Sequence, residues 1–228
     1  MEYEIKGGSF PIVICTLQKG ETMKNETGAM AYMTSDMKME TNTGGGLLKG
    51  LGRALSGDTI FLNFFTAQSD NQQIGFSACT PGKIIPIKLN GTNTIIGQKN
   101  AFLAAEDGVD LDIYFRKSLG AGLFGGEGFI LQKFSGNGIV FLEIDGEVIE
   151  HDLQPGEKLL VDPGHIAAME DGVSFDIERV KGAKNILFGE GLFFAKIEGP
   201  GKVWIQTMPI SRLAEAIIPY IPDKSSDW

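Results

Sequence analysis

The sequence predicts an all-β fold made of three copies of one β-unit, and two kinds of observation lead to this prediction. The chain has 31 glycines among its 228 residues, about twice the average usage of ~7%, and they separate short runs of Val, Ile, Leu and Phe. That composition is typical of many strands joined by tight turns. The second observation is repetition: the segment Leu153–Val173, which reads as turn, strand, turn and strand, recurs twice earlier in the chain.

The recurrence of this segment is clearest between its first and third copies. Leu17–Met33 aligns without a gap with Leu153–Met169, and the middle copy is Leu89–Val109. The middle copy shares an Ala and the run Glu-Asp-Gly-Val with the third copy. Chance is a poor explanation for both alignments. The identities between the first and third copies are Leu17, Gln18, Gly20, Glu21, Gly28, Ala31 and Met33 with Leu153, Gln154, Gly156, Glu157, Gly164, Ala167 and Met169.

A second repeated segment follows each copy of the first. Gly126–Ile144 lies without a gap over Gly189–Thr207, and a looser early version is Gly57–Ala78. The alternation of the two segments predicts a single domain of three packed repeats, approximately residues 10–78, 79–144 and 145–207, followed by a C-terminal helix and tail. From the order alone we expect the N-terminal strand, Phe10–Leu17, to complete the last unit and close a pseudo-threefold ring.

Strands and turns can be placed within the repeats. Ile139–Ile144 and Glu147–His151 flank Asp145-Gly146, a typical two-residue hairpin signal. Residues 159–161 and 166–169 flank Asp162-Pro163-Gly164, which is a second turn signal. Ser174–Ile177 alternates apolar and polar residues, as a half-buried strand does.

Two segments predict short helices, at about residues 46–55 and 211–218. The second has Ser211 as an expected N-cap, one apolar face formed by Leu213, Ala216 and Ile217, and Pro219 as its end. The first carries leucines at helical spacing and two cations. These leucines either cap an open end of the β-core or bind a partner subunit or a membrane surface. The candidate interaction residues are Leu47, Leu48, Leu51, Leu55, Lys49 and Arg53.

Charge and cysteine usage exclude some classes of function. The net charge is −9 and the pI about 4.8, which disfavours nucleic-acid binding because that binding depends on Lys and Arg at phosphates. Cys15 and Cys79 lie singly in apolar runs, so we expect buried free thiols in a reducing compartment. The N-terminus lacks the features of a signal peptide, and no apolar run reaches the ~18 residues of a spanning helix. These features predict a cytoplasmic protein.

No constellation for catalysis, metal or cofactor binding is found. His151 and His165 are far apart in sequence, and His165 is an alanine in both other copies, so no metal site is predicted. The run Gly120–Gly125 fits G-x-G-x-x-G, but a strand-like run follows where a nucleotide site needs a helix. No G-x-S-x-G is present.

Three carboxylates occupy one repeat position, which favours a structural role as acceptors of backbone N–H groups near glycine turns. Catalysis or cation binding by these groups is the alternative. The repeated acidic positions are Asp58, Glu127 and Glu190.

Several of these runs together resemble one family. GGGLLKGLGRALSGD, FLNFFTA, GGEGFILQKFSGNG, LLVDPGHIAA and GPGKVWIQTMP, in this order, are similar to the altered-inheritance-of-mitochondria protein 24 (mitochondrial biogenesis) family, and they cover nearly the whole chain. The resemblance implies a fold like that of the tryptophan RNA-binding attenuator protein. Each unit would be a β-sandwich or β-helix-like element, related to the cupin-type double-stranded β-helix and triplicated within one chain.

The resemblance also implies a general role. Members are mostly uncharacterised bacterial cytosolic proteins, and a eukaryotic relative acts in mitochondrial inner-membrane organisation. No catalytic residues are defined for the family, so none is carried over. We do not transfer the attenuator's binding of RNA and tryptophan, because the likeness is one of fold and this chain is acidic.

Three functions follow in order of preference. The first is a non-enzymatic scaffold or binding protein, acting through protein partners or at a membrane surface, with a homo-oligomer as one form. The alternative is a small-molecule binder or an enzyme with its site in a β-barrel mouth. The third is RNA binding by analogy of fold.

Overall fold

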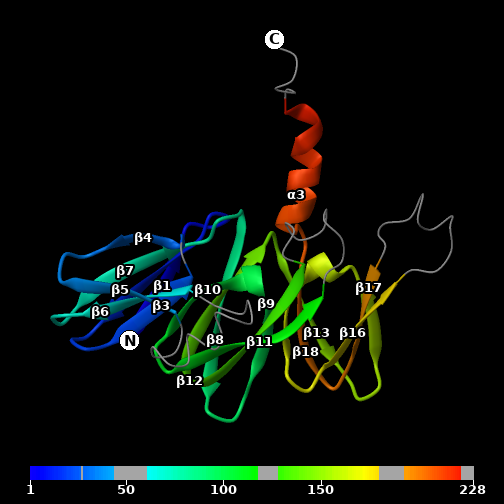
Figure 1. Ribbon diagram of the computed structural model, residues 1–228, viewed down its shortest axis with the longest axis horizontal. Coiled ribbons are helices and arrows are strands. Elements are labelled where there is room, and N and C mark those ends of the chain that lie inside the picture. Colours follow the sequence, from blue (N-terminus) through cyan, green and yellow to red (C-terminus); the bar gives the residue numbers. More distant parts are fainter. Residues whose placement is uncertain (27, 44–60, 118–127, 180–192, 222–228) are drawn as a thin grey trace.

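Most of the residues that the structure describes lie in β-strands, which confirms the predicted all-β class. The computed structural model describes residues 1–26, 28–43, 61–117, 128–179 and 193–221. Figure 1 shows these residues as a body of sheets with one projecting helix. The elements are β1 Glu2–Lys6, β2 Ile12–Leu17, β3 Thr22–Glu26, β4 Met30–Met33, β5 Met37–Thr43, β6 Phe61–Ala67, β7 Gln72–Ser77, β8 Gly82–Asn90, β9 Ile95–Gln98, η1 Lys99–Ala101, β10 Phe102–Glu106, β11 Val109–Lys117, β12 Phe129–Asp145, β13 Val148–Leu153, β14 Lys158–Val161, η3 Pro163–His165, β15 Ile166–Glu170, β16 Ser174–Arg179, β17 Phe193–Glu198, β18 Gly201–Gln206, α3 Ile210–Ile217 and η4 Ile218–Tyr220.

The same strand pairing occurs three times along the chain. In the first unit β7 lies between β2 and β4, and β6 lies between β3 and β5. In the third unit β18 lies between β13 and β15, and β17 between β14 and β16. In the middle unit the long strand β12 takes both central places, with β8 and β10 on its second half and β9 and β11 on its first. Each unit is therefore a pair of three-stranded sheets.

An irregularity of pairing also recurs at equivalent positions. The register shifts between Met30 and Tyr32 in β4, between Phe102 and Ala104 in β10, and between Ile166 and Ala168 in β15. A β-bulge bends its strand and increases the local twist. This recurrence is what three repeats of one unit would produce. The assignment of the whole chain to a single domain stays a prediction.

Two strand pairs join the units, and they share one register. β3 of the first unit pairs with β10 of the second, with Met23 opposite Glu106 and Lys24 opposite Ala105. β9 of the second unit pairs with β15 of the third, and there Ile95 lies opposite Glu170 and Ile96 opposite Met169. The gapless alignment of the copies makes these residue pairs equivalent. The sheets of neighbouring units are thus continuous.

The expected closure of a ring by the N-terminal strand is wrong. β2 pairs with β1 and with β7 of its own unit. In Figure 1 the three units follow one another along the long axis of the molecule, from the blue and cyan end to the yellow and orange end. The first and third units therefore lie at opposite ends of one chain.

The prediction of a β-hairpin at Asp145-Gly146 is also wrong. β12 and β13 do not pair: the second half of β12 is held by β8 and β10, and β13 pairs with β18. With both edges of β12 occupied, the chain has to pass on to the next unit at this point. Gly146 has a φ of +78°, and its N–H donates to Pro81 O at 2.9 Å. The turn chemistry was recognised correctly, but it serves a connection between units.

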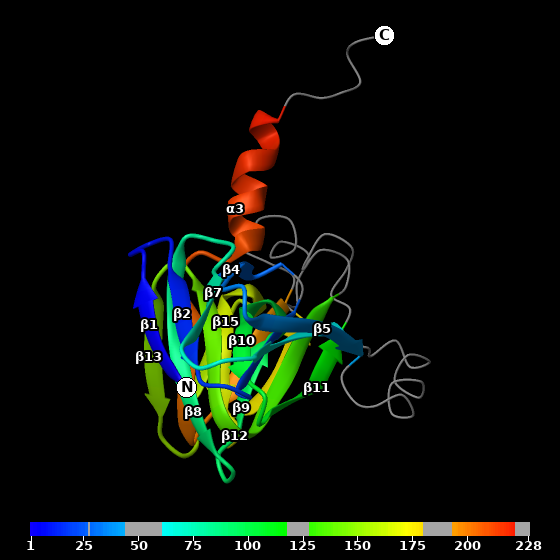
Figure 2. The ribbon, with the colours of Figure 1, turned by 90° about the vertical axis from the view of Figure 1, so that its left-hand side faces the viewer.

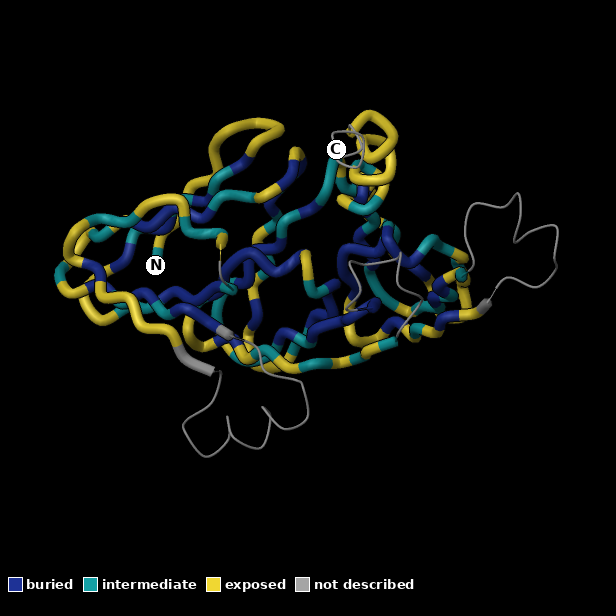
Figure 3. Tube along the Cα trace, turned by 45° about the horizontal axis from the view of Figure 1, so that its top comes forward, coloured by how far each residue is buried: buried dark blue, intermediate teal, exposed yellow. Residues whose placement is uncertain are grey.

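The buried residues form three clusters along the molecule, and each cluster draws residues from more than one unit. Phe65 and Phe76 meet edge to face in the first unit, and Phe102 stacks on Phe134 in the second. In the third cluster Phe129 stacks on Phe175 at 5.6 Å. Figure 3 shows the buried residues running through the whole length of the body. Burial of one such ring stabilises the fold by about 1.5–3 kcal/mol.

The C-terminal helix was predicted at 211–218 and is observed as α3 at Ile210–Ile217. Its N-cap is Pro209, whereas Ser211 lies inside the helix, so the predicted cap is wrong. Figures 1 and 2 show α3 standing out from the sheets. Among the described residues, no helix is long and apolar enough to cross a membrane. The helix predicted at 46–55 lies outside the described residues.

Candidate functional site

A cavity of about 490 Å³ lies at the base of α3. This volume falls within the range of small-molecule sites, about 300–1,000 Å³. Its walls come from all three units, because they are built from the ends of β3, β9, β12 and β18, from η1 and from the first turn of α3. The residues that line it include Glu26, Gln98, Lys99, Asp145, Gln206 and Ser211.

Gln206 is the central polar residue of this cavity. Its side-chain Nε2 donates to Gly164 O at 2.8 Å and to Gln98 Oε1 at 3.3 Å. Its Oε1 accepts from the backbone N–H of Asp145 at 3.1 Å. Gln98 and Gln206 are both buried. Because every polar atom of the Gln206 amide is engaged, this side chain joins the second and third units rigidly.

Asp145 connects the sheets to the helix. Its Oδ2 accepts from the backbone N–H of Ile210 at 2.8 Å, and its Oδ1 accepts from the Thr80 hydroxyl. The first N–H groups of a helix have no partner within the helix. A carboxylate also interacts favourably with the positive end of the helix dipole. Asp145 therefore provides the capping interaction that Ser211 was expected to make.

Two buried amides have atoms without a hydrogen-bond partner in the described part of the chain, and one of them, Gln132, contacts the cavity residue Glu26. Gln132, which is fully buried, donates from Nε2 to Glu26 Oε1 at 2.9 Å, but its Oε1 is unpartnered. Both polar atoms of the Asn25 side chain are also unpartnered. An unsatisfied buried polar group costs about 1–3 kcal/mol. Gln132 is therefore an acceptor that a ligand or water could satisfy.

Glu143 and Cys79 form a pair beside Thr80 and Asp145. The backbone N–H of Cys79 donates to Glu143 Oε2 at 2.8 Å, and the thiol lies 3.7 Å from Oε1. Burial raises the pKa of Glu143 to about 7. Partial desolvation and the Glu143 charge raise the pKa of Cys79 to about 11. A thiol with such a pKa is protonated at neutral pH, so this pair is poorly suited to nucleophilic catalysis.

The remaining cysteine and the histidines have structural positions. Cys15 is buried in β2, and burial raises its pKa to about 12. Both cysteines are free thiols, as predicted, but Cys79 is exposed, so the burial predicted for it is wrong. His165 ends η3, where its Nδ1 lies 2.7 Å from Gln206 O, whereas His151 lies on β13. Among the described residues, no group of three His, Cys, Asp or Glu side chains is placed to hold a metal ion.

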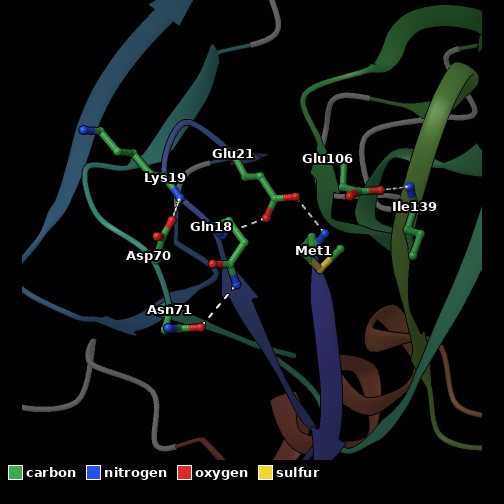
Figure 4. A network of polar contacts seen from close by, with 8 residues as sticks. All are labelled: Met1, Gln18, Lys19, Glu21, Asp70, Asn71, Glu106 and Ile139. Carbon is green, nitrogen blue, oxygen red and sulfur yellow. Dashed lines mark hydrogen bonds and ion pairs between the residues drawn. The ribbon is translucent and has the colours of Figure 1, made fainter.

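Repeated carboxylates accept backbone N–H groups at equivalent places. Glu21 Oε2 accepts from Gln18 N at 2.8 Å, and Glu157 Oε2 accepts from Gln154 N at 2.9 Å. Figure 4 shows Glu21 also receiving the N-terminal ammonium of Met1 at 2.8 Å. This contact lowers the pKa of Glu21 and raises that of the Met1 amine. The contacts hold turns and the first strand in place.

A second pair of equivalent carboxylates acts in the same way. Glu106 Oε2 accepts from Ile139 N at 2.7 Å, and Glu170 Oε2 accepts from Lys202 N at 2.9 Å. The Glu106 contact is drawn in Figure 4 beside the N-terminus. Repetition of an acid in this chain therefore marks a structural hydrogen bond at these positions.

The sequence-predicted site residues are not among those described. The interaction segment with Leu47, Leu48, Lys49, Leu51, Arg53 and Leu55 lies within 44–60, and so does Asp58. Glu127, Glu190 and the run Gly120–Gly125 also lie outside the described residues. Their proposed roles stay predictions. The cavity residues were missed because they are distant in sequence, although two of them, Glu26 and Gln98, share one repeat position.

The fold and the site define an all-β protein of joined sandwich units, with one cavity walled by all three units among the described residues. Comparison with known proteins gives the family. The chain belongs to the mitochondrial biogenesis AIM24 family, whose family model matches residues 3–208. The predicted family is thus confirmed.

Similar proteins occur in Streptococcus pyogenes. An uncharacterised protein of serotype M6 is 26% identical over 226 residues, which is 95% of this chain and 89% of that protein. A crystal structure of another Streptococcus pyogenes protein superposes with a TM-score of 0.78 and 22% identity, covering 96% of this chain and 99% of that one. This second likeness supports the fold alone.

Proposed function

We propose that the protein is a non-enzymatic scaffold that binds a partner protein through the apolar face of α3. The observation that carries the proposal is that α3 buries none of its residues. Ile210, Ile217 and Ile218 are 42%, 49% and 62% exposed, and Leu213 is half-buried. Their spacing places them along one side of the helix. Figure 3 shows α3, beside the C label, coloured mostly as exposed.

Charge favours a protein over a membrane as the occupant of this face. The described part of the helix carries one cation and one anion, Arg212 and Glu215, and the chain as a whole has a net charge of −9. Interfacial helices that bind anionic lipids carry several Lys or Arg residues on their polar face. An apolar groove on a partner protein is the surface that suits a short helix with an uncharged apolar side.

The fixing of α3 at its first turn is consistent with this role. Asp145, which holds Ile210 N, is itself held by Thr80 and by the Gln206 amide. A helix anchored only at one end by a rigid network presents the rest of its surface at a defined angle, which reduces the ordering cost of binding.

Photo-cross-linking from two faces of α3 tests the proposal. A photoreactive residue in place of Ile217 should give a discrete protein adduct in the native cell, whereas one in place of Glu215, on the same helix, should give little. Co-sedimentation with anionic and zwitterionic vesicles supplies the lipid comparison, and we expect no pelleting. Equal adducts at both positions, or vesicle binding abolished by Ile217→Asp, would contradict the proposal.

The cavity supports a second candidate function, the binding of a small polar molecule. Glu26 and Asp145 in its walls are carboxylates, and Gln132 Oε1 behind Glu26 is unpartnered. These acceptors suit a ligand that carries amine or hydroxyl donors.

A thermal-shift screen of small amines and polyols tests this candidate. A true ligand should raise the Tm of the wild-type protein but not that of Ala214→Trp, which places a bulky ring at the wall that α3 contributes. Glu215→Gln is the matched control and should keep the shift. A shift that survives Ala214→Trp, or no stabilising compound in the panel, would remove this candidate.

A further inference from the structure

Two strands lack the partner that their equivalents have at the junctions between units. The strands of the three units are counted in chain order from β2, β8 and β13. In this count the second strand of one unit pairs with the third strand of the next: β3 pairs with β10, and β9 pairs with β15. Among the described strands, β14 is a second strand with a neighbour on one side, β17, and β4 is a third strand with a neighbour on one side, β7. The third unit therefore has an open junction edge, and the first unit has the complementary one.

The open edges carry apolar residues that their equivalents bury. β9 is buried throughout, and the first four residues of both β10 and β15 are buried. In β14, which reads KLLV, Leu160 is 64% exposed. In β4, which reads MAYM, Tyr32 is 40% exposed. An exposed apolar strand edge is a template for pairing with another strand.

Other edges of the molecule do not share this property. Among the described strands, the fourth strands β5, β11 and β16 each have one paired neighbour, and this holds in all three units. β11 has the alternating exposure of a strand with one face in solvent. An open edge at the fourth strand is therefore a general feature of the unit. β4 and β14 differ from them, because the equivalents of β4 and β14 pair across a junction while these two strands pair with no neighbouring unit in the described part of the chain.

One chain cannot join its own open edges. In Figure 1 β4 lies in the first unit at one end of the long axis, and β16 and β17, in the sheet of β14, lie at the other. The complementary edge of a second copy is therefore the partner that fits each open edge of the described strands. A contact between two different surfaces of identical chains is head to tail, and it builds a ring or an open filament.

We propose that copies of this protein assemble head to tail, with β14 of one copy pairing antiparallel with β4 of the next. The alignment of the repeats fixes the register. Leu159 is equivalent to Ile95 and Thr34 to Glu170, which lie opposite each other in the β9–β15 junction. Leu159 therefore pairs with Thr34 of the second copy, and Leu160 pairs with Met33 of the second copy.

The directions of the backbone groups agree with this register. Gly199 N donates to Glu157 O, so the backbone N–H and C=O groups of Glu157, Leu159 and Val161 point toward β17. Those of Leu160 point toward the open side of β14. Thr34 N donates to Gln73 O, so the backbone groups of Thr34 point toward β7 and those of Met33 point toward the open side of β4. Leu160 and Met33 are the equivalents of Ile96 and Met169, which lie opposite each other within the chain.

A cross-strand disulfide tests both the partner and the register. Leu159 and Thr34 would form a non-hydrogen-bonded pair with Cα atoms about 4.5 Å apart, within the ~4.4–6.8 Å that a disulfide spans. The double variant Thr34→Cys and Leu159→Cys is made with Cys79→Ser, so that the exposed native thiol is absent. Mild oxidation should give a ladder of multiples of the 24.6 kDa chain on a non-reducing gel.

The matched control is Met30→Cys with Leu159→Cys in the same background, where the thiols would lie about 13 Å out of register. It should remain a single 24.6 kDa band. A ladder of equal strength from both pairs, or no ladder from the Thr34 pair in protein with wild-type circular dichroism, would overturn the proposal. The proposal does not depend on the partner of α3, because Ile217→Asp should leave the ladder unchanged.

Discussion

Replacing Phe134 with alanine is expected to lower the free energy of unfolding by about 3–5 kcal/mol. Phe134 is fully buried in the middle unit and stacks on Phe102 at 5.6 Å. Gly97 lies against it, and a Cβ at that position would come within 2.8 Å of the Phe134 ring. β9 therefore needs glycine here so that the ring can fill the space beside the junction with β15. Removing the ring leaves a cavity at that junction.

Urea unfolding followed by circular dichroism measures this effect. Tyr114→Ala in β11 is the matched control, because Tyr114 is an aromatic residue of the same unit that is 45% exposed. We expect the control to lose less than about 1 kcal/mol. Similar losses in the two variants would show that the middle core does not carry the stability assigned to it.

Glu143→Gln should stabilise the protein at alkaline pH by about 1–3 kcal/mol and have little effect at pH 4. Burial raises the pKa of Glu143 to about 7 from a reference of 4.5; the neighbouring Asp145 also raises it, and the Cys79 N–H opposes the shift. Between these two values the unfolded state has lost its proton and the folded state has kept it. The free energy of unfolding therefore falls as pH rises from about 4.5 to about 7. Above pH 7 the cost of the buried charge is fully present.

Urea unfolding of both proteins at pH 4, 6 and 8 checks this prediction. The glutamine retains an oxygen that can accept from Cys79 N, so the variant changes the charge and keeps the contact. Glu147→Gln is the control, because Glu147 is an exposed carboxylate two residues beyond Asp145. A stability difference between wild type and Glu143→Gln that is constant from pH 4 to pH 8 would contradict the assigned pKa.

Much of the fold could be predicted because repetition amplifies weak local signals. The pattern of Leu17–Met33 alone does not define where its strands lie, but its identities with Leu153–Met169 locate strands in both copies. The strands at 159–161 and 166–169 are observed as β14 and β15, and the helix at 211–218 is observed as α3. These segments are set by local patterning and turn residues.

The errors occurred where tertiary pairing overrides a local signal. Asp145-Gly146 has the residues of a hairpin turn, but both edges of β12 are already occupied by β8 and β10. The ring closure failed because β2 finds its partners, β1 and β7, within the first unit. Sequence order alone gives no distance between the first and last units.

The candidate site was less predictable than the fold for a related reason. The cavity is formed by Glu26, Gln98 and Gln206, which are far apart in the chain and meet only because the units stack. No local motif marks them. The open edges could be found only from the pairing, because β14 and its equivalent β9 have similarly apolar sequences. β9 differs from β14 in that it pairs with β15 of the next unit.

The solution mass of Leu160→Pro, compared with wild type and Leu160→Ala by light scattering, tests the head-to-tail assembly most directly. Proline removes an N–H that faces the open side of β14, and such a proline is tolerated on an edge strand. Wild type and Leu160→Ala should have masses of at least two 24.6 kDa chains, whereas Leu160→Pro should approach the mass of a single chain with an unchanged circular dichroism spectrum. A monomeric wild type, or a Leu160→Pro variant that keeps the wild-type mass, would contradict the account.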